Sequence, residues 1–411
     1  MYCKRIIGNI ILLAFGIVLS SCSTIRGYRA DGLNGPNIFS FEHHVHDTIP
    51  NGDQVFQFKV AESRADWIDT LHFYNDPPKC INQTFLEAMD SKSTTQGVMI
   101  IHDDCIVYEK YWGDFSADRL ATIFSISKSI TSLLCGIAVD EGYIESIDDP
   151  VTKYLPELKG KDPRWEMLTI RYLLCMFSGL DFEDEYDFNI KALKTVNAIA
   201  RLNYGHDLVK QIKGLKFRCD PGTSFRYESM ATAILGVVLE RATGRHYAEY
   251  LSEKVWIPLQ MESVALINID SPKHHVGHAF GGITCTLKDL AKIGRLYLNK
   301  GMWDGKRIVS EEWIRLTTDY YPEACYRYSW YDVRYEGFEP GQYPGFYALG
   351  ICNQVLYVNP HKNLIMVRIG LHNNGWATIP EVFEQLSNVW PEGHMRPDRD
   401  CIPSPGYSPE G

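Results

Sequence analysis

Several short motifs that define common enzyme classes are absent from this sequence of 411 residues. No G-x-S-x-G pentapeptide occurs, which argues against an α/β-hydrolase. The glycine patterns of phosphate-binding loops and dinucleotide sites are also missing, so nothing points to a nucleotide cofactor. The eleven cysteines include no C-x-x-C pair, and therefore neither a zinc ribbon nor a thiol redox motif is supported.

Histidine clusters are present, but they lack the spacing of common metal sites. The H-x-H-x-D-H pattern is not completed after His44, and H-E-x-x-H does not occur. The group His274, His275 and His278 matches no ligand pattern either. We therefore predict no metal site.

Positive charge is scarce. Lysine and arginine number 41 against 51 aspartates and glutamates, which gives a formal charge of −10. A negative surface repels phosphate backbones, so we expect no nucleic-acid partner. The chain is nevertheless 45% hydrophobic and only 22% charged, which is enough apolar sequence for a large folded core.

Long apolar runs are limited to the N-terminus. Lys4 and Arg5 precede an apolar stretch at 6–19, and small residues lead to Cys22, as in an export signal. Leu19-Ser20-Ser21-Cys22 resembles the bacterial lipobox, which implies cleavage before Cys22 and lipid attachment to its sulfur. The alternatives are a plain signal peptide or a short membrane anchor. We expect a lipid-anchored protein of the bacterial cell envelope, on the periplasmic or cell-surface side.

The remaining pattern predicts an α+β fold. Two β-rich runs, at 97–112 and 355–369, each contain a turn and predict hairpins. Apolar periodicity predicts helices at 127–143, 231–242 and 286–298. Hairpins at both ends favour one antiparallel sheet flanked by helices, with a mainly helical lobe inserted between. The expected domains are a signal peptide (1–21), a tether and N-terminal extension (22–65), a catalytic domain (66–395, lobe about 150–270) and a proline-rich tail (396–411).

A hydroxyl and an amine lie one helical turn apart in Ser125-Ile126-Ser127-Lys128. Positions i and i+3 share a helix face, so Lys128 can reach the Ser125 hydroxyl. Free backbone N–H groups at the helix start can stabilise negative charge on an attacked carbonyl oxygen. The spacing alone is weak evidence, because S-x-x-K occurs by chance roughly once in a chain of this length. A capped helix with a surface lysine is the alternative.

Tyr227-Glu228-Ser229 stands just before the second predicted helix. A tyrosine in such a loop is usually a packing residue. Ser125, Lys128 and Tyr227 together, however, resemble the serine β-lactamase and penicillin-binding protein superfamily, in its branch of class C β-lactamases, family-VIII esterases and 6-aminohexanoate-dimer hydrolases. Further blocks in the same order are similar to that branch, namely 168–180, 221–229, 255–261, 281–294 and 346–354.

The resemblance implies a β-lactamase/transpeptidase-like fold and specific roles. Ser125 would form an acyl-enzyme, with Lys128 and Tyr227 as the proton-transfer pair, and either of them could be the base. The backbone N–H groups of Ser125 and Ile351 would form the oxyanion hole. Ser229, Ala348 and Gly350 would contact a small-molecule or peptide-like substrate, and no cofactor is implied. The oligomeric state is left open.

One departure from the family pattern bears on the substrate. Relatives that bind β-lactams or D-alanyl peptides often have Lys or His where this chain has Ala348. Without that cation, an ester or amide lacking a carboxylate at that point is favoured. The alternatives are a β-lactamase or DD-peptidase, and a non-catalytic envelope protein of the same fold. The acidic stretch at 181–187 is either a solvated loop or a site for a substrate amino group.

Overall fold

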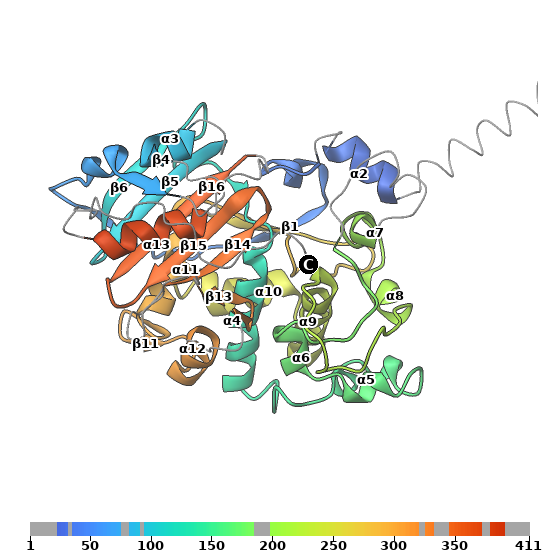
Figure 1. Ribbon diagram of the computed structural model, residues 1–411. Helices are drawn as coiled ribbons and strands as arrows, with labels where there is room; N and C mark the ends of the chain where they lie inside the picture. The colour runs from blue at the N-terminus through green and yellow to red at the C-terminus, as the bar shows by residue number, and fades with distance from the viewer. Residues whose placement is uncertain are drawn as a thin grey trace, which may run out of the picture.

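The computed structural model describes residues 23–31, 35–74, 82–90, 94–184, 198–319, 325–332, 345–371 and 379–390. Within these ranges, no helix has both the length and the apolar character needed to cross a bilayer. Strands from the two ends of the chain gather on one side of the molecule, and helices from its middle gather on the other (Figure 1).

An eight-stranded sheet is built by both ends of the chain, in the order β12-β13-β14-β15-β16-β5-β6-β2. The two predicted hairpins form its centre, where Ile365 of β16 lies opposite Ile101 of β5. All neighbouring strands are antiparallel except β2 and β6, which confirms the predicted antiparallel sheet. The strands are β2 (Lys59–Val60), β5 (Thr95–His102), β6 (Cys105–Tyr111), β12 (Tyr326–Arg327), β13 (Trp330–Asp332), β14 (Phe346–Gly350), β15 (Gln354–Asn359) and β16 (Leu364–Gly370).

Both faces of this sheet are covered by helices, so its central strands are apolar at successive positions. Ile101 and Leu356 belong to the core that contains residues of α11 (Leu287–Leu298). Ile100 and Tyr357 point to the opposite face, where α13 (Ile379–Val389) and α3 (Phe85–Asp90) pack. The sheet is therefore the middle layer of this half of the molecule.

The helix that carries the S-x-x-K motif, α4 (Ile126–Asp140), runs between the sheet and the helical lobe (Figure 1). It packs against α9 (Ser229–Thr243) and β14. Gly136 permits a close approach to α12 (Glu311–Thr318), since a Cβ there would lie 2.5 Å from the Trp313 ring. The three predicted helices are confirmed, although α4 ends earlier, before Gly142 at φ 76°. Shorter helices complete the lobe: α5 (Arg164–Met167), α6 (Ile170–Leu174), α7 (Ala198–Tyr204), α8 (Leu208–Lys213) and α10 (Tyr247–Leu251).

A second sheet brings the N-terminal segment onto the body. Its order is β1 (His46–Ile49), β8 (Ala265–Asn268), β9 (Ile283–Cys285) and β7 (Ala121–Thr122). Thr122, at the end of β7, stands three residues before Ser125, so this sheet also fixes the approach to the S-x-x-K helix. Part of the predicted N-terminal extension is thus paired with the body, while the predicted domain boundaries stay predictions.

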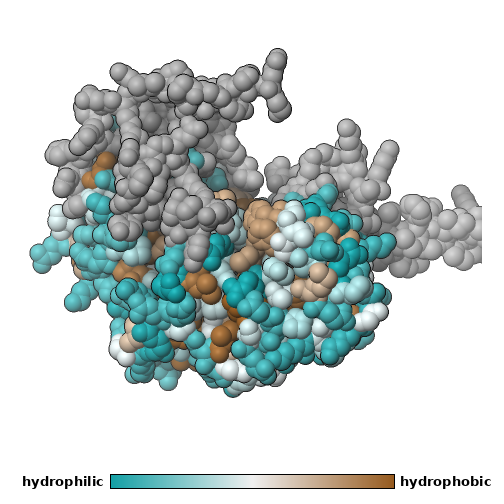
Figure 2. Space-filling model, turned by 60° about the horizontal axis from the view of Figure 1, so that its bottom comes forward, coloured by the Kyte–Doolittle hydropathy of each residue, from teal (hydrophilic) through white to brown (hydrophobic). Residues whose placement is uncertain are grey.

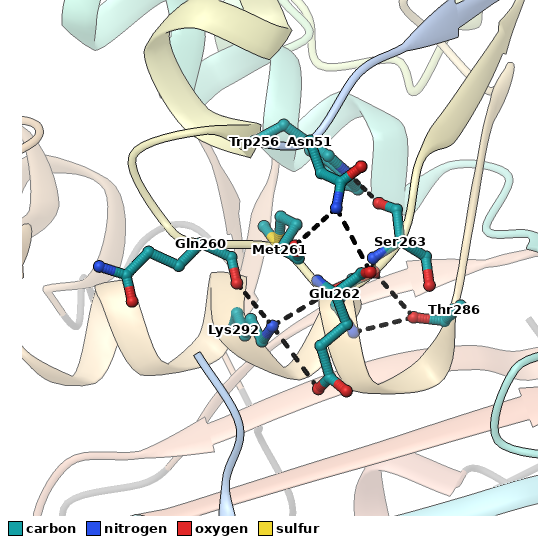
Figure 3. Close-up of polar contacts among 9 residues, drawn as sticks. Asn51, Trp256, Gln260, Met261, Glu262, Ser263, Thr286 and Lys292 are labelled. Atoms are coloured by element: carbon teal, nitrogen blue, oxygen red, sulfur yellow. Dashed lines mark hydrogen bonds and ion pairs between the residues drawn. The ribbon is translucent and has the colours of Figure 1, made fainter. Parts of the chain in front are cut away.

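A buried lysine away from the S-x-x-K motif, Lys292, ties α11 to the loop at 260–263 (Figure 3). Its Nζ donates to the Gln260 carbonyl oxygen at 2.9 Å and lies 3.3 Å from Asp289 Oδ1. Asp289 also accepts hydrogen bonds from the backbone N–H groups of Glu262 and Ser263, at 2.7 and 3.0 Å. Burial lowers the pKa of Lys292, while the two neighbouring carboxylates raise it. This network is structural, and it provides a control for the lysine beside Ser125.

Some large apolar side chains are exposed on the described surface. The face in Figure 2 is mainly hydrophilic, with hydrophobic residues in small groups. Large exposed side chains such as Met167, Phe225 and Ile257 come from separate parts of the chain. Scattered apolar residues of this kind are normal on a protein surface.

Candidate active site

Ser125 and Lys128 are in direct contact at the start of α4. Lys128 Nζ donates a hydrogen bond to Ser125 Oγ at 2.9 Å and another to the Phe280 carbonyl oxygen at 2.8 Å. The lysine side chain is buried, with 1% of its surface exposed, whereas Ser125 is half-buried. A surface lysine, the alternative considered from the sequence, does not fit this burial. The contact holds the amine where it can exchange a proton with the hydroxyl.

Tyr227 joins this pair from the loop before α9. Its ring centroid lies 5.1 Å from Lys128 Nζ, and the Ser125 side chain is near enough to its hydroxyl to lower the pKa of the phenol. Burial raises the pKa of the phenol well above 10, the Ser125 side chain lowers it, and the charge of Asp184 raises it. The phenol is therefore neutral near pH 7. A neutral phenol at this place can donate a proton to a group that departs from the acylated serine.

Two carboxyl groups, those of Glu228 and Asp184, lie near Tyr227. Glu228 is 1% exposed and accepts a hydrogen bond from the Ser178 hydroxyl. Asp184 Oδ2 accepts from the backbone N–H of Ser229 at 2.8 Å and from its hydroxyl at 2.7 Å. The Ser229 hydroxyl is thus engaged with Asp184, and its role in substrate binding stays a prediction. Burial, followed by the nearby Asp184 charge, raises the pKa of Glu228 to about 8.

The raised pKa predicts a pH-dependent effect of Glu228→Gln on stability. Between its ordinary value of 4.5 and about 8, Glu228 is ionised in the unfolded chain but still protonated in the fold. Wild-type stability therefore falls as pH rises through this window, by at most about 1.4 kcal/mol per pH unit, and levels off above it. Glutamine does not ionise, so the variant's melting temperature should gain on the wild type from roughly pH 5 to pH 8. A difference in melting temperature between Glu228→Gln and the wild type that does not change with pH would contradict the protonation of Glu228 in the folded protein.

The end of β14 approaches the nucleophile through backbone groups. A Cβ on Gly350 would lie 2.5 Å from the Ile123 carbonyl oxygen, so only glycine lets β14 pass this close to the chain before Ser125. The next residue, Ile351, begins a 3₁₀ turn and lines the same cavity as Ser125. Ala348 is fully buried in the core. The structure brings Ser125, Gly350 and Ile351 together, and their roles in the oxyanion hole and in substrate binding stay predictions.

An arginine that the sequence did not reveal supports this turn. Arg368 on β16 is fully buried, and its Nη1 donates to the carbonyl oxygens of Cys352 and Asn353 at 3.1 and 2.7 Å. Cys352 and Asn353 both have positive φ, 64° and 55°. Burial lowers the pKa of Arg368 to about 9, which still leaves it charged near neutral pH. A fixed cation thus holds a strained turn beside Ser125.

A small cavity opens beside Ser125. It holds about 50 Å³ of space, and its lining combines Ser125, Ile351 and Gly281 with residues from the N-terminal segment and α7. The N-terminal contribution was missed from the sequence, because residues 23–65 show no strong periodicity. Its lining residues are Pro36, Ser40, His44, Thr122, Phe124, Ser125, Ile199, Ala200, Asn203, Tyr204, Asn268, Phe280, Gly281 and Ile351.

Some predicted features fall outside the described residues. Cys22, the predicted lipidation site, is one of them, as are Glu185 and Asp187 of the acidic stretch. Of that stretch, Asp184 accepts hydrogen bonds from Ser229, near Tyr227, as described above. Within the described ranges, His, Cys, Asp and Glu side chains form no group of three that could hold a metal ion.

Known proteins resemble this chain in sequence and in fold. The sequence model of the beta-lactamase family matches residues 81–370. A 6-aminohexanoate-dimer hydrolase from Paenarthrobacter ureafaciens is 29% identical over 302 residues, which is 69% of this chain and 74% of the relative. A Bacillus anthracis structure provisionally named a 6-aminohexanoate-dimer hydrolase has a TM-score of 0.71 at 21% identity, covering 85% of this chain and 90% of its own. An octameric penicillin-binding protein homologue from Pyrococcus abyssi has a TM-score of 0.57 at 21% identity, covering 74% and 75%. The two structures confirm the predicted fold.

Proposed function

Since this chain belongs to the beta-lactamase family and is a serine hydrolase, we propose that it is exported and cleaves an amide or ester through an acyl-enzyme on Ser125. The observation that carries the proposal is the 2.9 Å hydrogen bond between Lys128 Nζ and Ser125 Oγ, in a chain whose Tyr227 hydroxyl also reaches Ser125. Nucleophile, proton-transfer pair and cavity meet at one point. This is the arrangement that covalent catalysis by serine requires.

In the proposed acylation, Ser125 Oγ forms a bond to the substrate carbonyl carbon while its proton passes to the Lys128–Tyr227 pair. The negative charge on the carbonyl oxygen is stabilised by the N–H groups of Ser125 and Ile351. The bond to the alcohol or amine then breaks, and the leaving group takes the proton from the same pair. Water attacks the acyl-enzyme and gives its proton to the pair, which returns one to Ser125 Oγ as the acid departs.

The surroundings of Ser125 favour an acyl group without a negative charge. Ala348 offers no cation at the position where many relatives have Lys or His. Among the described residues that line the cavity there is no lysine or arginine, and burial together with the charges of His43 and His46 lowers the pKa of His44 to about 4. The lining is therefore uncharged near pH 7. Esters and amides with neutral acyl groups suit this site better than substrates whose acyl group carries a carboxylate. β-Lactams are therefore the less favoured alternative.

Intact-mass spectrometry during turnover tests the proposal. The protein beginning after Cys22 would be mixed with p-nitrophenyl acetate, with the linear dimer of 6-aminohexanoate, and with a chromogenic cephalosporin. We expect ester hydrolysis and a transient mass increase equal to one acyl group, mapped to the peptide that contains Ser125. Turnover of the cephalosporin alone would move the proposal to β-lactam hydrolysis. No adduct and no turnover with any of the three would favour the non-catalytic alternative.

Export and lipid anchoring rest on the sequence of residues 1–22 alone. We expect the full-length protein to be recovered with bacterial membranes and released by detergent. Recovery in the soluble cytoplasmic fraction, with the N-terminus uncleaved, would contradict this part of the proposal. The catalytic part does not depend on it.

A further inference from the structure

The cavity beside Ser125 is completed by a segment that lies outside the matched family region. The family model begins at residue 81, yet Pro36, Ser40 and His44 line the cavity. The segment is fixed in place, since the Thr122 N–H donates to the Ile38 carbonyl oxygen at 2.9 Å, and β1 pairs with β8 directly after it. These N-terminal residues are therefore part of the site.

The far wall of the cavity is a pair of stacked rings. His44 and Tyr204, the last residue of α7, have ring centroids 5.0 Å apart and planes inclined by 28°. Helix α2 (Ser23–Asp31) holds Tyr204 from behind: Arg26 Nε donates to the Tyr204 carbonyl oxygen at 2.9 Å. A Cβ on Gly27 would lie 2.7 Å from the Tyr204 ring, so α2 packs directly on that ring. Figure 1 shows α2 beside α7 at this corner of the molecule.

A larger groove lies on the other side of these two rings. It holds about 390 Å³ and shares His44, Asn203 and Tyr204 with the cavity beside Ser125. The smaller cavity holds about 50 Å³, room for roughly four water-sized groups. The stacked pair thus separates the small cavity at the nucleophile, here called the short pocket, from the larger groove outside it.

The position of Tyr227 indicates which part of the substrate occupies the short pocket. Tyr227 and Lys128 supply the proton to the leaving group, so the leaving group departs on their side. Neither residue lines the pocket, whereas Ser125 and Ile351 do. The pocket therefore lies on the acyl side of the carbonyl. Its lining also includes Asn268, which is 7% exposed and whose side-chain oxygen has no hydrogen-bond partner in the described residues.

We propose that the His44–Tyr204 pair closes the acyl pocket and limits this enzyme to short, uncharged acyl groups of roughly two to four heavy atoms beyond the carbonyl. The inference rests on the proposed Ser125 acyl-enzyme. It adds the substrate class and assigns its selection to the N-terminal segment and α7. Removing either ring joins the pocket to the outer groove, which then accommodates longer chains.

The test uses p-nitrophenyl esters from acetate to octanoate, so that the leaving group is constant and only the acyl chain changes. We expect the wild type to show its highest kcat/KM for acyl chains of three to five carbons, counting the carbonyl carbon. In Tyr204→Ala, and independently in His44→Ala, the ratio of kcat/KM for octanoate to that for acetate should rise at least tenfold. His246→Ala is the matched control, because it removes one ring of another stacked pair, His246–His275, outside the cavity lining.

Each outcome decides the inference. A rise in the octanoate-to-acetate ratio in both ring variants, but not in His246→Ala, supports the acyl wall. An unchanged ratio in folded variants overturns it, and so does an equal fall for every chain length, which is the result of a purely structural role. A shift in the preference between phenyl and p-nitrophenyl acetate instead would place the pocket on the leaving-group side and also overturn it. If the wild type hydrolyses none of these esters, this inference fails; if it also cleaves neither the amide nor the cephalosporin and forms no acyl adduct, the proposed function fails with it.

Discussion

We expect Lys128→Met to lower kcat/KM for p-nitrophenyl acetate by roughly a thousandfold, the scale of a lost proton-transfer group. Methionine fills nearly the same volume as lysine but cannot donate to Ser125 Oγ or accept its proton. The Ser125 hydroxyl then loses the amine that lies 2.9 Å from it and that shares its proton. Ser125→Ala should be at least as impaired and should also form no acyl adduct.

Loss of fold is the competing explanation, because Lys128 is buried and also bonds the Phe280 carbonyl oxygen. Lys292→Met provides the matched control, since Lys292 is equally buried, bonds a carbonyl oxygen at 2.9 Å and lies outside the cavity lining (Figure 3). We expect Lys292→Met to lower the melting temperature at least as much as Lys128→Met, with kcat/KM reduced less than threefold. Similar losses of activity in both variants would show that the effect is structural. Full activity of folded Lys128→Met would remove Lys128 from the mechanism.

The parts of the fold and site that follow from short-range sequence were predictable. The two hairpins were indicated by apolar runs around a turn, and the contact of Ser125 with Lys128 follows from an i, i+3 spacing on one helix. The cap of α11 is equally local, since the Thr286 hydroxyl accepts from the backbone N–H of Asp289 three residues later. Each of these features depends on residues within a few positions of one another.

The features that the sequence did not reveal depend on distant contacts. Arg368 reaches a turn sixteen residues away only because β16 pairs with β15, and in the sequence it is one charged residue inside an apolar strand. Glu228 looks solvent-exposed in a polar loop, whereas the fold buries it against Ser178. The pocket wall joins His44 to Tyr204, which are 160 residues apart along the chain. No local periodicity carries such information.

The second large effect is expected for Arg368→Met. Its guanidinium donates to two carbonyl oxygens of the 351–353 turn and, through Nε, to Thr95 Oγ1 at 2.9 Å. Hydrogen bonds to a charged group contribute about 1.5–3 kcal/mol each, so loss of these three should lower the free energy of unfolding by about 4.5 kcal/mol or more. If the turn moves, the Ile351 N–H leaves its position beside Ser125. Loss of one oxyanion-hole donor typically lowers kcat by about 10²- to 10³-fold.

The kinetic pattern separates a positioning role for Arg368 from general destabilisation. Arg368 is fully buried and does not line the cavity, so KM for the ester should change little while kcat falls. Binding of an alkylboronic acid, whose adduct with serine places an oxygen in the oxyanion hole, should weaken by a factor similar to the loss in kcat. Thr95→Val is the matched control: it removes one partner of Arg368 but keeps both bonds to the turn, so kcat should stay within about threefold of the wild type. A folded Arg368→Met enzyme with wild-type kcat and boronate affinity would show that the turn holds its position without the guanidinium, and strain at Cys352 and Asn353 would then have to be balanced by the surrounding core.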